Sequence, residues 1–192
     1  RFNRTEYELH ELLAFSVLVA GKKASTVAPQ LQQLLHDLYA EYNGRGLLKT
    51  RMYPLDLFAW YSQSGLAARL KKAGIGCHGQ KSRTLLELGT LTRERRIDLA
   101  TCSTRDLEAV PGIGPKTSRF FVLHSRPNQR LAVLDTHVLK HLRAQGVSGV
   151  PKSTPSGATY ARLEAEFLRL ADATALSPAE YDLSIWRHYA AQ

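Results

Sequence analysis

Residues 107–124 read LEAVPGIGPKTSRFFVLH, and this stretch decides the fold class of the chain. A short helix is expected to end at Val110, because Pro111 and the glycines that follow it interrupt the helical pattern. Residues 111–114 then turn the chain. A second helix is expected to begin at Pro115, since proline favours the first position of a helix. The segment therefore predicts two helices joined by a tight hairpin.

The chemistry of this hairpin suits the backbone of DNA. Gly112 and Gly114 allow positive φ and carry no side chain, so backbone N–H groups of the turn and of the next helix can approach a phosphate. Ile113 is expected to be the buried anchor between the two helices. Such a contact positions a duplex without reading its sequence. A plain helical hairpin, whose glycines serve only the tight turn, is the alternative.

Helical spacing of apolar residues continues along almost the whole 192-residue chain. The breaks include Asn43-Gly44, residues 126–128 and a stretch at 146–156 that is rich in Gly, Ser and Pro. Capping patterns at 103–106 and 177–180 mark helix starts. These signals predict an all-α fold of eight or nine helices.

The charge of the chain favours a polyanionic partner. There are 26 Lys and Arg against 17 Asp and Glu, a formal net charge of +9. Such an excess attracts nucleic acid through a long-range field that salt weakens, although a merely soluble basic protein would have the same charge. The longest near-continuous apolar run, residues 12–20, is far shorter than the roughly 20 residues of a membrane span, so no membrane partner is expected.

The two cysteines, Cys77 and Cys102, do not form a disulfide framework, and a reducing intracellular compartment, the cytoplasm or the nucleus, is expected. They also cannot supply a four-cysteine metal site. Because the chain starts at Arg1, its natural N-terminus is expected to be missing, and targeting cannot be judged.

A second segment makes the hairpin more specific. Residues 131–139 read LAVLDTHVL, and they follow the hairpin at a spacing of some 20 residues. Together the two segments resemble the helix-hairpin-helix DNA glycosylases, the family that includes endonuclease III and the 8-oxoguanine DNA glycosylases. Residues 74–81 and 181–189 are similar to a loop and the last long helix of that family. The resemblance implies that Lys116 is the catalytic lysine and Asp135 the catalytic aspartate.

The residues themselves are suited to that chemistry. Lys116 is expected at the start of a helix, where the helix dipole disfavours a cation, and partial burial would further favour a neutral, nucleophilic amine. Asp135 is expected to cap the next helix and to stay ionised. A fixed carboxylate stabilises the positive charge that develops on a sugar when an N-glycosidic bond breaks. Without the resemblance, Asp135 is equally well explained as a cap, and Lys116 as a phosphate contact.

The resemblance implies a bifunctional DNA glycosylase and abasic-site lyase acting on double-stranded DNA. Lys116 would attack C1′, Asp135 would stabilise the sugar cation, and a Schiff base would then undergo β-elimination. The target would be a flipped-out base that is damaged, and expected to be oxidised, or modified. A non-catalytic helix-hairpin-helix DNA-binding module is the alternative.

Further residues are expected to contact DNA or the flipped base. The expected DNA contacts lie in the hairpin and in the helix after residue 77: Gly112, Ile113, Gly114, Thr117, Lys81 and Arg83. The expected base-pocket or wedge residues are Lys22, Ile75, His78, Gln80, Phe120 and Trp186. Solvated loop positions, or aromatic residues of the core, are the alternative for these side chains.

No iron–sulfur cluster is expected, because no cysteine follows Cys102. The resemblance allows a monovalent cation at the hairpin, and the chain is expected to act as a monomer. His137 and His141 have a spacing that could bind a metal, but no third ligand is indicated, so no metal site is expected.

The predicted architecture is a two-lobed glycosylase fold formed by residues 1–192 as a single unit. Residues of about 20–132 would form a helical barrel that contains the hairpin at 104–124. The second lobe would combine about 1–19 with 133–192, and DNA would enter the cleft between the lobes.

Overall fold

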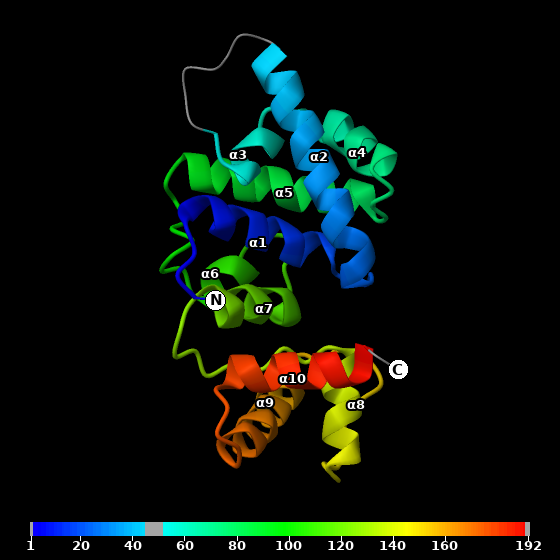
Figure 1. The fold of residues 1–192 in the computed structure, drawn as a ribbon, viewed down its shortest axis with the longest axis vertical. Helices are drawn as coiled ribbons and strands as arrows, with labels where there is room; N and C mark the ends of the chain where they lie inside the picture. The colour runs from blue at the N-terminus through cyan, green and yellow to red at the C-terminus, as the bar shows by residue number, and fades with distance from the viewer. Residues whose placement is uncertain (1, 45–51, 191–192) are drawn as a thin grey trace. The chain divides into compact units, whose positions relative to one another are not determined.

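The computed structural model describes residues 2–44 and 52–190, which contain helices and no strand (Figure 1). The all-α prediction is confirmed. The helices are α1 (Glu6–Leu18), α2 (Ala24–Gly44), α3 (Pro54–Phe58), α4 (Gln63–Lys72), α5 (His78–Arg93), α6 (Thr104–Glu108), α7 (Pro115–Ser125), α8 (Thr136–Ala144), α9 (Gly157–Asp172) and α10 (Pro178–Ala190). These ten helices of the described residues exceed the predicted eight or nine, because a helix as short as α3 is too brief to show an apolar period.

The described residues fall into two compact units. The N-terminal unit is Asn3–Gly114, and the C-terminal unit consists of Phe2 and the described residues from Pro115 onwards. The predicted lobes divide the chain differently, since α1 belongs to the N-terminal unit and α7 to the C-terminal unit. The bounds of the lobes follow from the resemblance to the glycosylase family and stay a prediction.

The N-terminal unit is built around α5, which packs against α1, α3 and α4. Its helix starts are well defined: Thr5 and Glu8 form a capping box on α1, and Ser103 and Asp106 form the predicted one on α6. The largest fully buried side chains of this unit include Leu13, Leu18, Leu31, Leu38 and Phe58. The short helix α6, which leads into the turn at 111–114, therefore belongs to a firmly packed unit.

The C-terminal unit has a core formed by α8, α9 and α10. Leu139 and Leu142 of α8 pack with Leu163 and Phe167 of α9 and with Ile185 of α10. A smaller cluster joins Leu123 of α7 to Val133 and Ala179, with Phe2 packed against it. These two clusters fix α7 and the segment before α8, which carry the predicted catalytic residues.

No helix in the described ranges is both long enough and apolar enough to cross a bilayer.

Candidate active site

The hairpin has the predicted order of helix, turn and helix. Gly112 has φ of +93°, and a Cβ there would overlap the Thr84 hydroxyl, which donates a 2.8 Å hydrogen bond to the Pro111 carbonyl. A side chain at this position is therefore excluded both by conformation and by space. Ile113 is buried, as predicted for the anchor, and its N–H donates to the Val110 carbonyl at 3.1 Å.

Lys116 is the second residue of α7, which begins at Pro115 as predicted. Burial lowers the pKa of its amine, while the carboxylates of Asp135 and Asp182 act in the opposite direction. The Nζ atom lies 5.9 Å from the centre of the Phe120 ring. Within the described part of the chain, this amine makes no hydrogen bond. Its surroundings therefore favour the neutral, nucleophilic form without blocking its lone pair.

Asp135 is the N-cap of α8, which confirms the predicted helix start. Its carboxylate accepts the backbone N–H groups of His137 and Val138, each at 2.9 Å. The preceding residues are fixed from α9, because the Tyr160 hydroxyl donates to the Ala132 carbonyl at 2.8 Å and accepts from the N–H of Leu134. The structure thus brings Lys116 and Asp135 into electrostatic reach of each other in one unit.

Two residues of the site were missed by sequence reasoning. Asp182 of α10 is buried, and its Oδ2 lies 2.9 Å from Nε2 of His124, at the end of α7. Burial raises the pKa of Asp182, and its hydrogen bond to His124 acts against that rise. A signal existed in the sequence: Asp182 lies between Tyr181 and Ile185 on the apolar face of a helix, where a charged side chain needs a partner.

The chain is similar to known proteins in its structure rather than in its sequence. No family model and no curated protein matches the sequence. The 8-oxoguanine glycosylase/lyase of Methanocaldococcus jannaschii, in complex with DNA containing 8-oxoguanine, matches with TM-score 0.69 and 19% identity, over 99% of this chain and 84% of that one. A further structure of the 8-oxoguanine DNA glycosylase from that organism matches with TM-score 0.72 and 19% identity, over 99% of this chain and 81% of that one. The 8-oxoguanine DNA glycosylase of Thermotoga maritima matches with TM-score 0.69 and 24% identity, over 95% of this chain and 79% of that one.

The chain has the fold of the 8-oxoguanine DNA glycosylases.

In this glycosylase fold, the two aromatic residues predicted for the base pocket both lie in the C-terminal unit. Phe120 is half-buried, with its ring centre 5.0 Å from that of His124. Trp186 is 39% exposed on α10, one helical turn after Asp182. A partly exposed indole retains a face on which a base could stack, so its predicted role stays open to test.

The predicted wedge residues lie in the N-terminal unit, together with Lys22. The Lys22 side chain lies across Gly76, where a Cβ would be 2.9 Å from its Nζ. The structure therefore joins Lys22 to the loop at 74–80, which sequence alone could not show. Gln80 is exposed and His78 half-buried, whereas Ile75 is 3% exposed and packs into the core. In this conformation His78 and Gln80 are the accessible wedge candidates.

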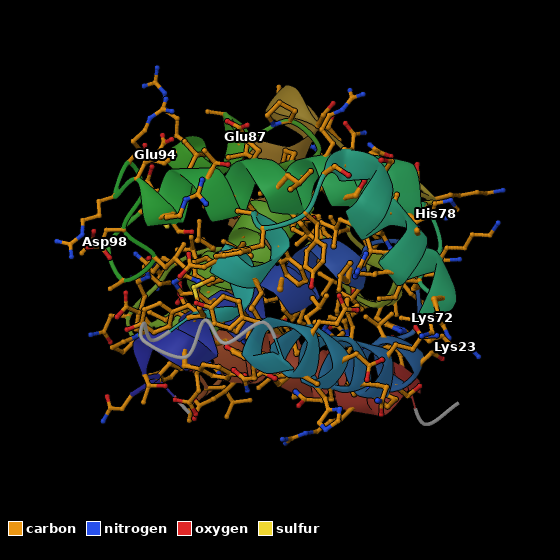
Figure 2. All side chains as sticks on the ribbon, turned by 90° about the horizontal axis from the view of Figure 1, so that it is seen from above. Lys23, Lys72, His78, Glu87, Glu94 and Asp98 are labelled. Atoms are coloured by element: carbon orange, nitrogen blue, oxygen red, sulfur yellow. The ribbon has the colours of Figure 1, made fainter. Side chains whose placement is uncertain are left out.

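The labelled charged side chains of the N-terminal unit lie at both of its ends. Lys23, Lys72 and His78 lie toward the end that carries the predicted wedge loop, and Glu94 and Asp98 toward the other (Figure 2). Arg95 and Arg96 follow Glu94 in the sequence, so that second end carries charges of both signs. Arg83, predicted to contact DNA, is exposed on α5.

The prediction that Lys81 contacts DNA is corrected by the structure. Lys81 is 6% exposed, and its Nζ donates a 2.6 Å hydrogen bond to the carbonyl of Leu18, the last residue of α1. An amine held in this way cannot reach a phosphate. Thr117 is also buried, so only its backbone could contribute to the hairpin's phosphate contact.

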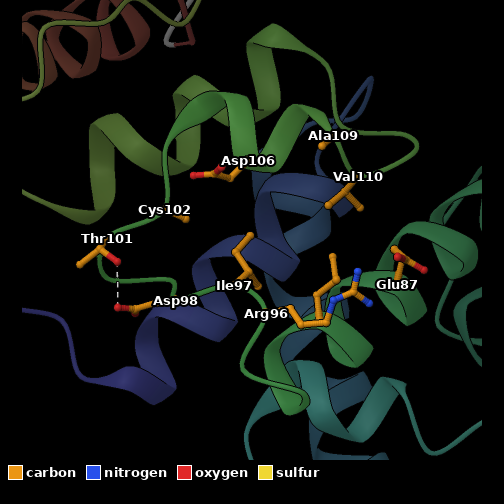
Figure 3. A pocket seen from close by; sticks show the side chains of 10 residues that line it. Glu87, Arg96, Ile97, Asp98, Thr101, Cys102, Asp106, Ala109 and Val110 are labelled. Carbon is orange, nitrogen blue, oxygen red and sulfur yellow. Dashed lines mark hydrogen bonds between the residues drawn. The ribbon is translucent and has the colours of Figure 1, made fainter.

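A pocket of about 490 Å³ occurs elsewhere in the N-terminal unit (Figure 3). Its polar groups are largely satisfied within the protein. Asp98 accepts from Thr101 Oγ1 at 2.8 Å and from the Ala100 N–H, and Asp106 accepts from Ser103. None of the predicted site residues lines this pocket.

Among the described residues, no three His, Cys, Asp or Glu side chains form a group that could hold a metal ion. His137 and His141 instead contact tyrosines of α10. The His141 ring hydrogen-bonds the Tyr181 hydroxyl at 2.8 Å, and the His137 ring stacks on Tyr189 at 6.4 Å between centres.

Proposed function

We propose that the protein is a monomeric bifunctional DNA glycosylase and abasic-site lyase that removes an oxidised purine, 8-oxoguanine first, from double-stranded DNA. The observation that carries this proposal is the pairing in one unit of a poorly solvated amine, Lys116, with a carboxylate, Asp135, that α8 holds in place. The fold shared with the 8-oxoguanine glycosylases, at TM-scores of 0.69 to 0.72, supports the choice of base.

In the proposed reaction, the lone pair of Lys116 Nζ forms a bond to C1′ of the flipped nucleotide. The electrons of the N-glycosidic bond leave with the base, which takes up a proton. Asp135, held by two backbone N–H groups, stabilises the cationic sugar. The proton lost from nitrogen passes to O4′ as the C1′–O4′ bond breaks and the sugar ring opens, which gives an iminium. Removal of a C2′ proton then expels the 3′ phosphate, and hydrolysis frees Lys116.

The proposed chemistry uses only side chains of this chain. An iron–sulfur cluster would need four thiolates, and the sequence contains Cys77 and Cys102 alone. A monovalent cation at the hairpin stays a prediction, and replacing potassium by lithium in a DNA-binding titration would test it.

Borohydride trapping tests the proposal directly. The protein is incubated with duplexes containing an abasic site or a single 8-oxoguanine, together with reductant, and covalent adducts are separated by denaturing electrophoresis. We expect adducts with both duplexes, their loss in Lys116→Gln, and their retention in Lys152→Gln, which changes an exposed lysine of the same unit.

The outcomes separate the alternatives. An adduct with the abasic duplex alone would retain the lyase and reject 8-oxoguanine as the base. Binding without an adduct on either duplex would favour the non-catalytic DNA-binding module.

A further inference from the structure

One face of α7 presents three functional side chains in a row. Lys116, Phe120 and His124 are spaced four residues apart, so they follow one another along the same side of the helix. The Phe120 ring bridges the row, since its centre lies 5.9 Å from Lys116 Nζ and 5.0 Å from the centre of the His124 ring. The amine and the imidazole therefore belong to one continuous site.

Asp182 joins this row from α10. Its Oδ2 and Nε2 of His124 are 2.9 Å apart, and each side chain is 9% exposed. A carboxylate buried to this extent is costly unless a partner compensates its charge, and the imidazole is such a partner. A buried Asp–His contact of this length is maintained by one proton held between the two groups.

The charged and titratable groups in reach of Asp182 come from each helix around it. They are Lys116 and His124 on α7, Asp135 at the start of α8, and Tyr160 on α9. Burial raises the pKa of Tyr160 well above its usual range, so this hydroxyl stays neutral. Two carboxylates, one imidazole and one amine therefore determine the local charge.

We propose that His124 and Asp182 act as a proton-sharing pair that keeps the net charge beside Lys116 low, with His124 as a positioning residue for the nucleophile. This inference rests on the proposed function and adds two residues to its site. When one proton is shared between Nε2 of His124 and the Asp182 carboxylate, and Nδ1 carries its own N–H, the pair is neutral whichever of the two groups holds the shared proton. Among the described residues, Asp135 is then the net negative group that acts on the amine. An unneutralised Asp182 would be a second one and would favour the unreactive ammonium.

Two nearly isosteric variants separate the charges of the pair. In His124→Gln, the amide can still donate to Asp182, but the positive charge is lost. In Asp182→Asn, the negative charge is lost. A merely structural pair would respond alike to both changes, whereas an electrostatic pair would shift the titration of Lys116 in opposite directions.

The titration is measured on the full chain by reductive methylation with formaldehyde and cyanoborohydride, at pH values from 6 to 11. Mass spectrometry of peptides gives the rate at Lys116, with the exposed Lys152 as the internal reference. The half-point pH for Lys116 is expected to rise by about one unit in His124→Gln and to fall by about one unit in Asp182→Asn, the size expected for one charge at close range. The double variant carries neither charge and is expected to resemble the wild type.

Unchanged half-points, or shifts in the same direction, would overturn the proposal. If Asp182→Asn fails to fold, the half-point pH of Lys116 in His124→Gln decides alone. A half-point that does not rise in this variant overturns the proposal. The readout needs no DNA, so it distinguishes this inference from the proposed function, which borohydride trapping with the two duplexes tests separately.

Discussion

Lys81 and Lys116 both lie in the first turns of helices that follow glycine-containing turns, and burial lowers the pKa of both amines. Their partners differ. Lys81 donates to the carbonyl of Leu18 at the C-terminus of α1, where a helix dipole favours a cation and a free carbonyl needs a donor. Lys116 lies at the N-terminus of α7, where the dipole disfavours a cation.

This contrast shows that burial alone does not make a lysine reactive. The Lys81 amine is occupied by a backbone acceptor and serves to join α5 to α1. The Lys116 amine is influenced by the charges of Asp135 and Asp182 but hydrogen-bonded to neither, so its lone pair is available. A hydrogen-bonded amine such as that of Lys81 serves the fold, whereas the amine of Lys116 is available to react.

The largest expected effect is a difference in adduct formation between variants of Lys116 and Lys81. Lys116→Met removes the nucleophile and is expected to lower adduct formation with abasic DNA by at least about 1000-fold. Lys81→Met should retain adduct formation within a few-fold but lower stability by about 1–3 kcal/mol, because the Leu18 carbonyl loses its donor. Single-turnover trapping and urea unfolding measure the two effects. Equal losses of activity in the two variants would contradict the contrast.

Asp135 allows its charge to be separated from its role as a cap. Asp135→Asn retains a capping side chain but removes the charge, so base removal is expected to slow by about 100-fold with little change in melting temperature. Asp135→Ala should show the same slowing and lose a further ~1 kcal/mol of stability, because the N–H groups of His137 and Val138 lose their acceptor. Normal base removal by Asp135→Asn would leave this residue a cap only.

The turns before the two lysines are expected to differ in their tolerance of a methyl group. Gly112→Ala should lower the free energy of unfolding by about 2 kcal/mol and weaken DNA binding, because φ at this position is positive and Thr84 is held by its hydrogen bond to the Pro111 carbonyl. Gly76→Ala should cost less than about 0.5 kcal/mol, since the obstructing atoms are the flexible end of Lys22. Thermal melting and a fluorescence binding titration would compare them. Similar costs would mean that the Gly112 turn can relax.

The local parts of the fold could be predicted from the sequence because short-range rules determine them. Pro115 at a helix start, Ile113 as a buried anchor and Asp135 as a cap each depend on a few neighbouring residues, and all three are confirmed. The helix α3 was harder, since five residues are too few for an apolar period, whereas the equally short α6 was predicted from its capping pattern and from the break at Pro111.

The site was less predictable where it depends on distant contacts. His124 and Asp182 are 58 residues apart, and only the packing of α10 on α7 brings them together. Lys81 was wrongly predicted to contact DNA, although its spacing from Leu85 and Leu88 places it on the buried face of α5. That spacing was a usable signal, whereas the acceptor at Leu18 was not visible in the sequence.

The smallest expected effect concerns stability and its dependence on pH. A lowered pKa means that unfolded chains bind more protons than folded ones at pH values between the folded pKa and the ordinary 10.5, so stability rises with pH across this window. Lys116→Met lacks the unfavourable burial of this charged amine and is expected to be more stable than the wild type at pH 7, by up to about 1 kcal/mol. The advantage should disappear as the pH approaches 10.5. Lys81→Met should be less stable than the wild type throughout, because the bond to Leu18 is lost at every pH. Urea unfolding at pH 7, 8.5 and 10 would show opposite signs for the two variants at neutral pH, and the same sign would mean that both amines serve the fold alone.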